Sequence, residues 1–426
     1  MKLKINQIFD FDKWSLQSLK NIPWEYDFIT ASEDWKTHNE YTHNWEFLVF
    51  AMWASWSLGR THYVNWKFIS SDLCFIISPK DKYKDKINLK FYHTYFNVIK
   101  EDIVKHTATW TSKIAINRKN FWNYELFLPD LEFQNSFFEK FIEIKNSNDK
   151  LLDITNQNQN YIKLLKQSIL QEAIEWKLTK SWREKNKDIE PASVLLEKIK
   201  AEKEELVKQK KFKKQKELDP ISENEIPFDI PESWEWSKLG NIIKESWNLN
   251  IHSQLDENEL INYVDIASID SKKYEIWEII PQKVSKLSSR ARRVLKKWYI
   301  MYSLVRPYLN NLAIIKNEKD NYIGSTWFNV FKPIIININY VFNFLLSDYV
   351  KNYYLELMKW FNSPWITNDN FINTLFPLPP LEEQKEIVKR VDEMMKLCDE
   401  LEKQTLETKE NSENLMKAVL GEVFSK

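Results

Sequence analysis

The sequence contains very little glycine and cysteine. Only 4 of its 426 residues are Gly and only 2 are Cys, Cys74 and Cys398, whereas glycine ordinarily makes up about 7% of residues. Two cysteines cannot build a disulfide framework, and their scarcity is typical of a reducing compartment. We therefore expect a cytoplasmic protein. The lack of glycine is harder to reconcile with folding, because many tight turns require it.

Long apolar runs, net charge and enzyme signatures are also missing. The apolar segment 47–56 is too short to cross a bilayer, so we expect no membrane association. Lys and Arg together number 61, and Asp and Glu together also number 61. The overall charge therefore neither favours nor excludes binding to nucleic acid. No phosphate-binding loop, dinucleotide fingerprint, nucleophile elbow or amino-methyltransferase tetrapeptide is present, and the 6 histidines show no metal-ligand spacing. We expect no catalytic residue, metal or cofactor in this chain.

One pattern is compatible with a nuclease. Pro129-Asp130, followed by Glu143-Ile-Lys145, satisfies a loose spacing in which two acids and a lysine meet at a metal. In such nucleases these residues lie on adjacent strands. Here Glu143 and Lys145 fall within a predicted helix. A nuclease therefore remains the weaker interpretation, and it requires Asp130, Glu143 and Lys145 to converge.

Tryptophan is abundant where glycine is missing. The chain has 19 Trp, several of them in contexts such as Asp34-Trp35-Lys36, Asn44-Trp45-Glu46 and Asn65-Trp66-Lys67 between short strand-like runs. Hairpin turns of this kind ordinarily carry Asn-Gly or Asp-Gly, because their central residues adopt positive φ. We therefore hypothesise that the gene reads UGA as glycine, and that these positions are Gly in the cell. The alternative is a protein that is truly rich in Trp and poor in Gly.

The hypothesis covers 16 of the 19 tryptophans. Trp182, Trp234 and Trp236 are excluded because their contexts suit tryptophan. If the others are glycine, arguments from aromatic stacking at those positions do not hold. The positions concerned are Trp14, Trp24, Trp35, Trp45, Trp53, Trp56, Trp66, Trp110, Trp122, Trp176, Trp247, Trp277, Trp298, Trp327, Trp360 and Trp365.

The most informative feature that is present is an internal repeat. Residues 110–132 and 360–382 align without a gap at an offset of 250, with Asn-Phe-x-Asn and Pro-x-Leu-Glu-x-Gln in register. The same offset continues into a long helical segment after each copy. Two copies of a domain followed by a helix predict pseudo-twofold symmetry, which suits a target with two separate halves.

The two helical segments are predicted to pair with each other. Each has a stripe of apolar residues at 3-4 spacing that is interrupted by polar residues in its middle. The stripes are too narrow for a globular face, which favours pairing over the alternative that each packs on its own domain. The residues expected at the pairing surface are Phe137, Phe141, Ile144, Leu151, Leu165, Ile169, Ile387, Val391, Met394, Cys398, Leu401 and Leu415.

The predicted fold class is α+β, with two α/β domains joined by two long antiparallel helices that form a coiled-coil spacer in a pseudo-twofold repeat. The first domain spans residues 1–130, with short strand-like runs and a helix near 89–100. A helical spacer and linker follow at 131–219. The second domain is expected at 220–380 and the C-terminal spacer helix at 381–426.

Basic residues are concentrated between positions 283 and 297. This stretch contains seven cations and no acid. Lys and Arg neutralise phosphates, while Arg and Asn can read base edges. An isolated run of this kind is often only a solvated surface, but its place in one of two repeated domains favours DNA contact. The expected DNA-binding residues are Arg60, Lys113, Arg118, Lys119, Lys286, Arg290, Arg292, Arg293, Lys296, Lys297, Arg306, Tyr308 and Asn310.

Several motifs taken together resemble the specificity subunits of type I restriction–modification systems. They are Leu165–Leu178, Glu190–Lys203, Ile226–Gly240, Tyr302–Pro307 and Phe376–Gln384. The resemblance covers nearly the whole chain. The family pattern also has glycine at three of the positions suspected of recoding, which are Trp176, Trp298 and Trp327.

The resemblance implies a non-catalytic reader of double-stranded DNA. In the family, two target recognition domains each read one half of a split target, while the paired helices set the unread gap and dock two methyltransferase subunits. Those subunits bring S-adenosylmethionine, and a motor-nuclease subunit that uses ATP and Mg²⁺ completes the restriction complex. The poor alignment of residues 1–109 with the second half suits two different half-sites. The alternative function is a coiled-coil scaffold whose globular heads bind protein without DNA readout.

Overall fold

The computed structural model describes residues 1–13, 16–17, 21–53, 57–109, 114–211, 215, 217–316, 321–360 and 364–424. The predicted DNA contact Lys113 and three of the suspected glycine positions, Trp14, Trp56 and Trp110, lie outside these residues. The chain divides into two compact units, Met1–Asn158 with Thr405–Lys426, and Gln159–Gln404. No helix of the described residues is long and apolar enough to cross a membrane.

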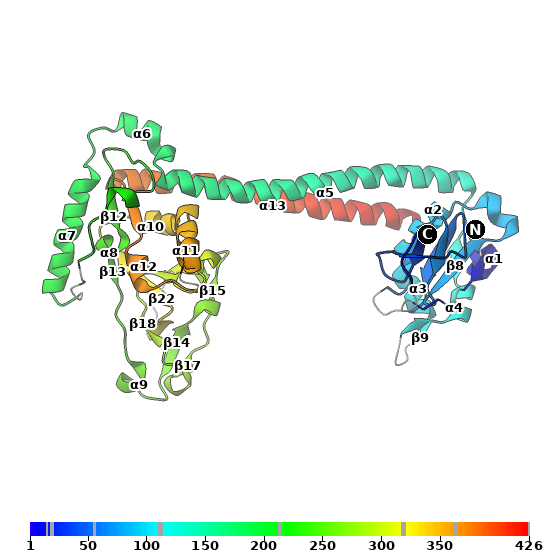
Figure 1. Ribbon diagram of the computed structural model, residues 1–426, viewed down its shortest axis with the longest axis horizontal. Helices are drawn as coiled ribbons and strands as arrows, with labels where there is room; N and C mark the ends of the chain where they lie inside the picture. Colours follow the sequence, from blue (N-terminus) through cyan, green and yellow to red (C-terminus); the bar gives the residue numbers. More distant parts are fainter. Residues whose placement is uncertain are drawn as a thin grey trace. The chain divides into compact units, whose positions relative to one another are not determined.

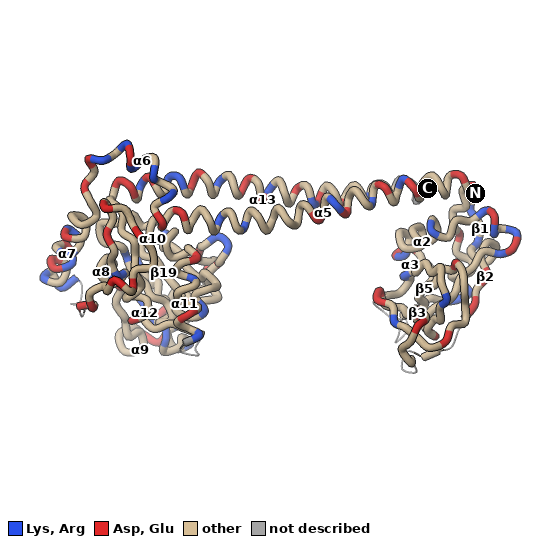
Figure 2. The backbone as a smooth tube through the Cα atoms, turned by 45° about the horizontal axis from the view of Figure 1, so that its top comes forward, with Lys and Arg blue, Asp and Glu red and all other residues tan. Residues whose placement is uncertain are grey.

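Two long helices, each of 44 residues, follow the two copies of the repeat. They are α5 (Leu131–Ile174) and α13 (Leu381–Phe424), and each begins at the leucine of its Pro-x-Leu motif (Figure 1). Basic and acidic residues both occur along them (Figure 2). The start points differ by the 250-residue offset that the sequence repeat predicts.

The two helices pack against each other and are antiparallel. In the first unit the Ser412 hydroxyl lies 2.5 Å from Asn148 Oδ1. In the second unit Lys166 Nζ lies 2.7 Å from Glu402 Oε2, and Arg390 on α13 donates to the Leu178 carbonyl just after α5. Residue numbers rise along α5 as they fall along α13. This confirms the predicted pairing of two antiparallel helices.

The described part of the first domain contains a four-stranded and a three-stranded sheet covered by short helices. The four-stranded antiparallel sheet has the order β2 (Phe9–Asp12), β8 (Cys74–Pro79), β5 (Phe47–Ala51) and β6 (Thr61–Val64). The three-stranded sheet has the order β4 (Lys36–His38), β3 (Tyr26–Ile29) and β7 (Phe68–Ser70), with β3 and β7 parallel. Two strand pairs complete it, β1 (Lys2–Lys4) with β11 (Glu125–Phe127) and β9 (Ala108–Thr109) with β10 (Ala115–Ile116). The helices are α1 (Ile5–Ile8), α2 (Leu89–Val98), α3 (Lys100–Thr107) and α4 (Arg118–Asn123).

The second domain has the same kind of architecture. One four-stranded sheet has the order β13 (Ile243–Glu245), β22 (Phe328–Pro333), β19 (Ile300–Ser303) and β20 (Leu312–Ile314). The other has the order β17 (Gln282–Lys283), β14 (Leu260–Val264), β21 (Tyr322–Ser325) and β18 (Ala291–Val294). Two strand pairs are β12 (Glu235–Lys238) with β23 (Leu375–Leu378) and β15 (Ile269–Asp270) with β16 (Glu275–Ile276).

Seven shorter helices accompany these sheets in the described part of the second unit. Among the described residues they are α6 (Lys180–Lys185), α7 (Ala192–Lys208), α8 (Leu239–Ile242), α9 (Ile251–Gln254), α10 (Ile338–Leu345), α11 (Asp348–Trp360) and α12 (Asn368–Ile372). α10 and α11 lie beside α5, and α9 lies at the far end of the domain (Figure 1). The core that joins α5, α13, α10 and the first sheet includes Ile169, Ile387 and Phe344.

The two domains share one topology. The sheet β2-β8-β5-β6 corresponds strand for strand to β13-β22-β19-β20, and each domain has a second sheet built on a parallel pair, β3 with β7 and β14 with β21. The sequence repeat covers only the last part of each domain. The structure therefore extends the pseudo-twofold relationship over residues that align poorly.

The described tryptophans differ in backbone conformation and in burial. Trp45, Trp176 and Trp298 adopt positive φ of 87°, 62° and 65°, a region that bulky residues rarely occupy. Nine suspected glycine positions carry side chains that are 41% exposed or more: Trp24, Trp35, Trp45, Trp66, Trp247, Trp277, Trp298, Trp327 and Trp365. By contrast, Trp234 is buried and donates to Glu383 Oε2 at 2.8 Å. Trp53, Trp122 and Trp176 are also suspected glycine positions, but they are partly buried and pack against core residues. Burial therefore does not separate the two sets, and the recoding hypothesis stays a prediction.

Candidate nucleic-acid interface

The basic run at 283–297 surrounds strand β18 in the second domain. Lys286 ends a short 3-10 turn, Val284–Lys286, before this strand. Arg290 immediately precedes β18, whereas Lys296 and Lys297 follow it. Arg290 and Lys296 therefore lie at opposite ends of the strand. The run that the sequence suggested as one basic surface contributes cations to two separate places.

Arg293 is the most enclosed cation of the run. Its Nη1 lies 3.5 Å from the Ser246 carbonyl, and its Nε has no hydrogen-bond partner among the described residues. Burial lowers the pKa of the Arg293 guanidinium, and the Glu245 carboxylate opposes that shift. Arg292, the preceding residue, is exposed and donates from Nε to the Ser289 carbonyl at 2.7 Å. Of the two, Arg292 has the side chain that is open to a ligand.

Arg290 belongs to the same end of the domain as the β19–β20 loop, residues 304–311. The backbone amide of Thr326 donates to the Arg290 carbonyl at 2.9 Å, and that of Leu304 donates to the Trp327 carbonyl at 2.9 Å. The turn at residues 326–327 therefore links the segment at Arg290 to the β19–β20 loop. Arg306 and Tyr308 on this loop are exposed, and Asn310 is half-buried. The structure brings these four predicted contact residues to one edge of the sheets.

The opposite end of β18 carries a group of lysines, Lys211, Lys244, Lys296 and Lys332, which we call the lysine patch. Lys244 and Lys332 are directly paired across the strands β13 and β22. Burial lowers the pKa of Lys244, and the charges of Lys296, Lys211 and Lys332 lower it further. Like charges directly opposite each other destabilise a sheet. A bound anion would relieve that repulsion.

Sequence reasoning missed most of the lysine patch. Only Lys296 was among the expected DNA contacts. Lys211 follows α7, while Lys244 and Lys332 lie on strands almost ninety residues apart. No local sequence pattern indicates that Lys244 and Lys332 are neighbours. The register of β13 against β22 could be found only from the folded chain.

In the first domain the predicted contacts lie near the end of β5. Arg60 directly precedes β6, and its Nη1 lies 3.4 Å from the Ala31 carbonyl. Arg118 and Lys119 are exposed at the start of α4. The amide of Ile116 donates to the Met52 carbonyl at 3.1 Å, which holds the segment before α4 beside the loop that follows β5.

The predicted helix-pairing residues differ in burial. Five are buried: Phe141, Ile169, Ile387, Val391 and Cys398. Phe137, Ile144 and Met394 are partly buried. The remaining four are 42–53% exposed: Leu151, Leu165, Leu401 and Leu415. Buried and exposed positions therefore alternate along the pairing surface, and the polar residues Asn148, Thr155 and Ser412 are among the buried ones.

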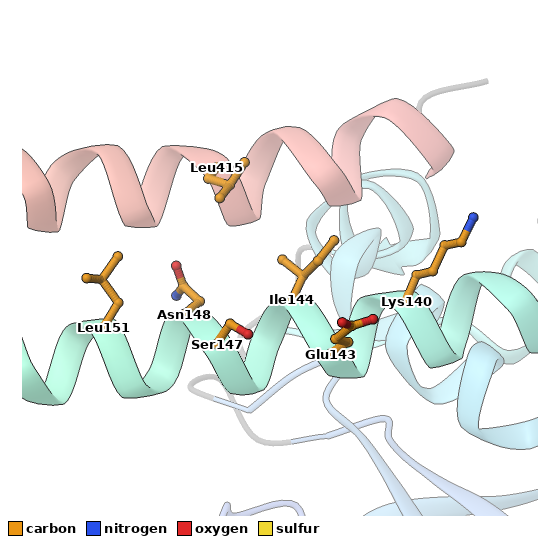
Figure 3. A pocket seen from close by; sticks show the side chains of 7 residues that line it. All are labelled: Lys140, Glu143, Ile144, Ser147, Asn148, Leu151 and Leu415. Atoms are coloured by element: carbon orange, nitrogen blue, oxygen red, sulfur yellow. The ribbon is translucent and has the colours of Figure 1, made fainter.

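A groove between the helices accounts for part of this exposure. In the first unit it has a volume of about 460 Å³ and is lined by Lys140, Glu143, Ile144, Ser147, Asn148, Leu151 and Leu415. Leu415 of α13 points toward the face of α5 that carries Ile144, Asn148 and Leu151 (Figure 3). These side chains face each other without filling the space between the helices.

The three residues of the nuclease pattern do not converge. Asp130 caps α5, since its Oδ1 accepts from the Phe133 amide at 2.7 Å. Glu143 lies thirteen residues further along the same helix, about 20 Å at 1.5 Å per residue. Lys145 pairs with Asp149 at 3.5 Å. Among the described residues no group of three His, Cys, Asp or Glu could hold a metal ion.

Known proteins have similar sequences and a similar architecture. Residues 231–410 match the family described as type I restriction modification DNA specificity domain. The EcoAI type I restriction enzyme specificity subunit of Escherichia coli is 32% identical over 273 residues, which are 61% of this chain and 44% of that protein. The chain thus spans less than half the length of this relative.

Two solved structures match the whole chain. One comes from a study of complex assembly and conformational transition of the type I R-M system, with a TM-score of 0.65, 15% identity, and coverage of 100% of this chain and 97% of that one. The other is the HsdS subunit from Thermoanaerobacter tengcongensis, with a TM-score of 0.56, 15% identity, and coverage of 100% and 96%. At this identity the match shows the fold, including the two long packed helices.

Proposed function

Since the chain belongs to the family of type I restriction–modification specificity subunits, we propose that it is the non-catalytic, DNA-binding subunit of such a complex. It reads a double-stranded target in two separate halves. Each domain reads one half, and the paired helices α5 and α13 set the length of the gap that is not read.

The shared topology of the two domains is the observation that carries this proposal. The same strand order occurs twice, β2-β8-β5-β6 and β13-β22-β19-β20, with different side chains on the equivalent loops. A repeated frame with different side chains suits the reading of two unlike half-sites. Two small interfaces on one chain also bind more tightly together than either alone, because the second contact becomes intramolecular.

The basic residues supply the contacts that DNA requires. Arg290, Arg306 and the exposed Arg118 and Lys119 of the first domain lie beside loops at the edges of the sheets, and they are the proposed base contacts. The lysine patch concentrates positive charge, and among the described residues Glu202 offsets part of it by its attraction to Lys244. Lysines in this arrangement contact phosphates and make binding strongly dependent on salt.

The partners of the complex follow from the same proposal. Two methyltransferase subunits bring S-adenosylmethionine, and a motor-nuclease subunit uses ATP and Mg²⁺. In the second unit the long helices expose Leu164 and Leu165 on α5, and Leu397 and Leu401 on α13, each by 44% or more. Apolar side chains of this size are stabilised by a covering partner. We propose that the methyltransferase subunits bind over these exposed leucines.

Methylation mapping tests the function directly. The chain is co-expressed with the methyltransferase encoded beside it, and adenine methylation is mapped across the host DNA. We expect a bipartite motif that disappears when this chain is deleted. Assembly of the complex without any methylated motif would refute DNA readout and favour the scaffold, whose heads bind protein.

A further inference from the structure

The strands that carry the lysine patch have equivalents in the first domain, but the charges differ. β2 and β8 occupy the places of β13 and β22 in the shared strand order. The pair directly before the proline that ends the longer strand is Lys244 with Lys332 in the second domain and Asp10 with Ser78 in the first. Lys80 Nζ lies 3.7 Å from Asp10 Oδ1. The same frame therefore holds two like charges in one domain and an ion pair in the other.

Two further segments bring lysines to this place. Lys296 follows β18, whose last residue accepts a hydrogen bond from the hydroxyl of the serine that follows β13. Lys211 lies in the linker just beyond α7, and Gln215 of the same linker donates to Glu245 on β13 at 3.1 Å. Lys211 and Lys296 are both close enough for their charges to lower the pKa of Lys244. The patch therefore combines two paired strands, the end of a third and a linker that occurs once in the chain.

The acid that follows Lys244 in the sequence is engaged elsewhere. Neighbouring residues of a strand point to opposite faces of a sheet, and the two carboxylate oxygens of Glu245 accept from Asn329 at 2.8 Å and from Gln215. Glu202 on α7 attracts Lys244. In the described part of the chain, however, no ion pair joins any of the four lysines to a carboxylate. Two of the lysines are exposed and two are half-buried, so the patch presents an excess of positive charge to solvent.

The patch lies on the side of the second domain that faces away from the incoming helix α5. Figure 1 shows α7 and α8 on the side of this domain opposite to α11, and α5 enters the unit from the side of α11. Lys211 follows α7, and β13 with Lys244 follows α8. On the proposed function the paired helices span the unread gap, so the gap lies on the side from which α5 enters. DNA that continues past the second domain therefore leaves on the side of α7.

Strand β18 connects the patch to the edge that carries the proposed base contacts. Arg290 and Lys296 stand at its two ends, and six residues of extended chain span at most about 20 Å, at about 3.3 Å per residue. One strand of DNA advances by about 3.4 Å per base, so this distance corresponds to about six base pairs. Lysine contacts phosphate as a point charge and reads no base. A duplex bound at the edge can therefore reach the patch with its flanking backbone.

We propose that the lysine patch binds the phosphates of DNA outside the target, on the flank next to the half-site that the second domain reads. The first domain, with Asp10 and Ser78 at the equivalent place, does not make this contact. The dependence of affinity on flanking DNA is therefore one-sided. This inference rests on the proposed function, and it adds an asymmetry that two copies of one frame do not by themselves predict.

Shortening the DNA on one side at a time tests the proposal. The complex of this chain with its methyltransferase is titrated with duplexes that contain the mapped motif and about 12 flanking base pairs on each side, or about 2 on one side. We expect removal of one flank to weaken binding about tenfold or more, and to reduce the slope of log affinity against log salt by about 2, since each lost phosphate contact accounts for about 0.9. Removal of the other flank should change the affinity less than about twofold.

A double variant identifies the flank that matters. Lys244→Gln combined with Lys332→Gln should bind the long and the shortened duplexes equally, with about the affinity that the wild type has for the shortened one. Lys316→Gln, which removes an exposed lysine paired with Glu275, is the control and should keep the wild-type difference. Like charges directly opposite each other destabilise a sheet, so the double variant should be at least as stable as the wild type in thermal unfolding.

Three results would overturn the assignment of the patch. They are equal effects of shortening either flank, a one-sided effect that persists in the double variant, and a double variant that no longer assembles with the methyltransferase. The last result would mean that the patch binds an acidic surface of a partner subunit. A wild-type complex that assembles but methylates no motif would instead refute the proposed function itself.

Discussion

Gln134 and Gln384 make two matching hydrogen bonds at the same point of the two long helices. Each lies near the N-terminus of its helix and is fully buried. Gln134 donates to the Pro129 carbonyl at 2.9 Å and accepts from the Asn88 amide at 2.8 Å. Gln384 donates to the Pro379 carbonyl and accepts from the Asn337 amide, both at 2.9 Å. Each glutamine therefore ties a long helix to the first residues of a helix in its own domain.

Replacing either glutamine should loosen the helix from its domain. Gln134→Ala and Gln384→Ala leave a buried amide and carbonyl without their partner, which costs about 1–3 kcal/mol for each group left unsatisfied. We expect a loss of this order in the free energy of unfolding, measured by denaturant titration. Gln157→Ala, on the exposed surface of α5, is the matched control. Equal stability of all three variants would contradict the anchoring role.

The carboxylate of Glu383 joins three segments of the second unit. It lies 2.7 Å from Arg183 Nη2, and it also accepts from the Thr179 hydroxyl at 2.7 Å and from Trp234. Glu383 is fully buried. Removing one partner of a buried ion pair leaves the other charge uncompensated, a cost of about 3–5 kcal/mol.

Glu383→Ala should therefore lower the free energy of unfolding of the second unit by about 3–5 kcal/mol. The exposed pair of Glu382 and Lys385, 2.6 Å apart, offers the control. Glu382→Gln should cost less than about 1 kcal/mol, because water screens an exposed pair. Thermal and denaturant unfolding would measure both variants. A Glu383→Ala protein as stable as Glu382→Gln would show that the buried pair does not hold these segments together.

The stability of the first domain should depend on His62 in acid. Burial, followed by the charges of Arg60 and His93, lowers the pKa of His62 to about 4 from its ordinary 6.5. Between these values the unfolded chain binds more protons than the folded one. The free energy of unfolding is thus fully maintained above pH 6.5 and falls as the pH drops toward 4.

Replacing His62 with Gln should reduce this acid sensitivity. Gln cannot take up a proton, so the difference in unfolding free energy between pH 7 and pH 5 should be smaller than in the wild type. His252→Gln, on α9 in the other unit, is the control and should keep the wild-type difference. Denaturant titrations at the two pH values would measure it. An equal pH dependence in wild type and His62→Gln would rule out this group as the source.

The lysine patch should govern affinity without changing the motif. Lys244→Gln and Lys332→Gln should weaken binding to any DNA sequence, and each lost phosphate contact should reduce the slope of log affinity against log salt by about 0.9. Titration of an oligonucleotide at several salt concentrations would measure the slope. Lys316→Gln, which removes an exposed lysine paired with Glu275, is the control. A changed recognition motif with an unchanged slope would contradict this role.

The native protein should carry glycine at the sixteen suspected tryptophan positions. Intact-mass measurement of protein purified from its source would decide this, because glycine is much the lighter residue. A mass that fits tryptophan at all of them would end the hypothesis. In recombinant protein, Trp45→Gly and Trp298→Gly should each raise stability, by on the order of 1 kcal/mol, since these exposed residues have positive φ. Trp234→Gly should destabilise, because that side chain is buried.

The sequence by itself determined the long helices and their pairing. Apolar residues at 3-4 spacing are local signals, and the repeat located the starts at Leu131 and Leu381 without any knowledge of the fold. The motifs from Leu165 to Gln384 were sufficient to identify the family. The expected DNA-binding residues came from charge and residue type alone, so they named candidates without placing them.

Tertiary structure alone decided how those candidates are grouped. It separated Arg290 from Lys296 at opposite ends of β18 and set Lys244 opposite Lys332. The physical reason is that strand order and register depend on pairing between distant segments. A helical stripe can be read from neighbours three and four residues apart, whereas a β-sheet neighbour can lie anywhere in the chain.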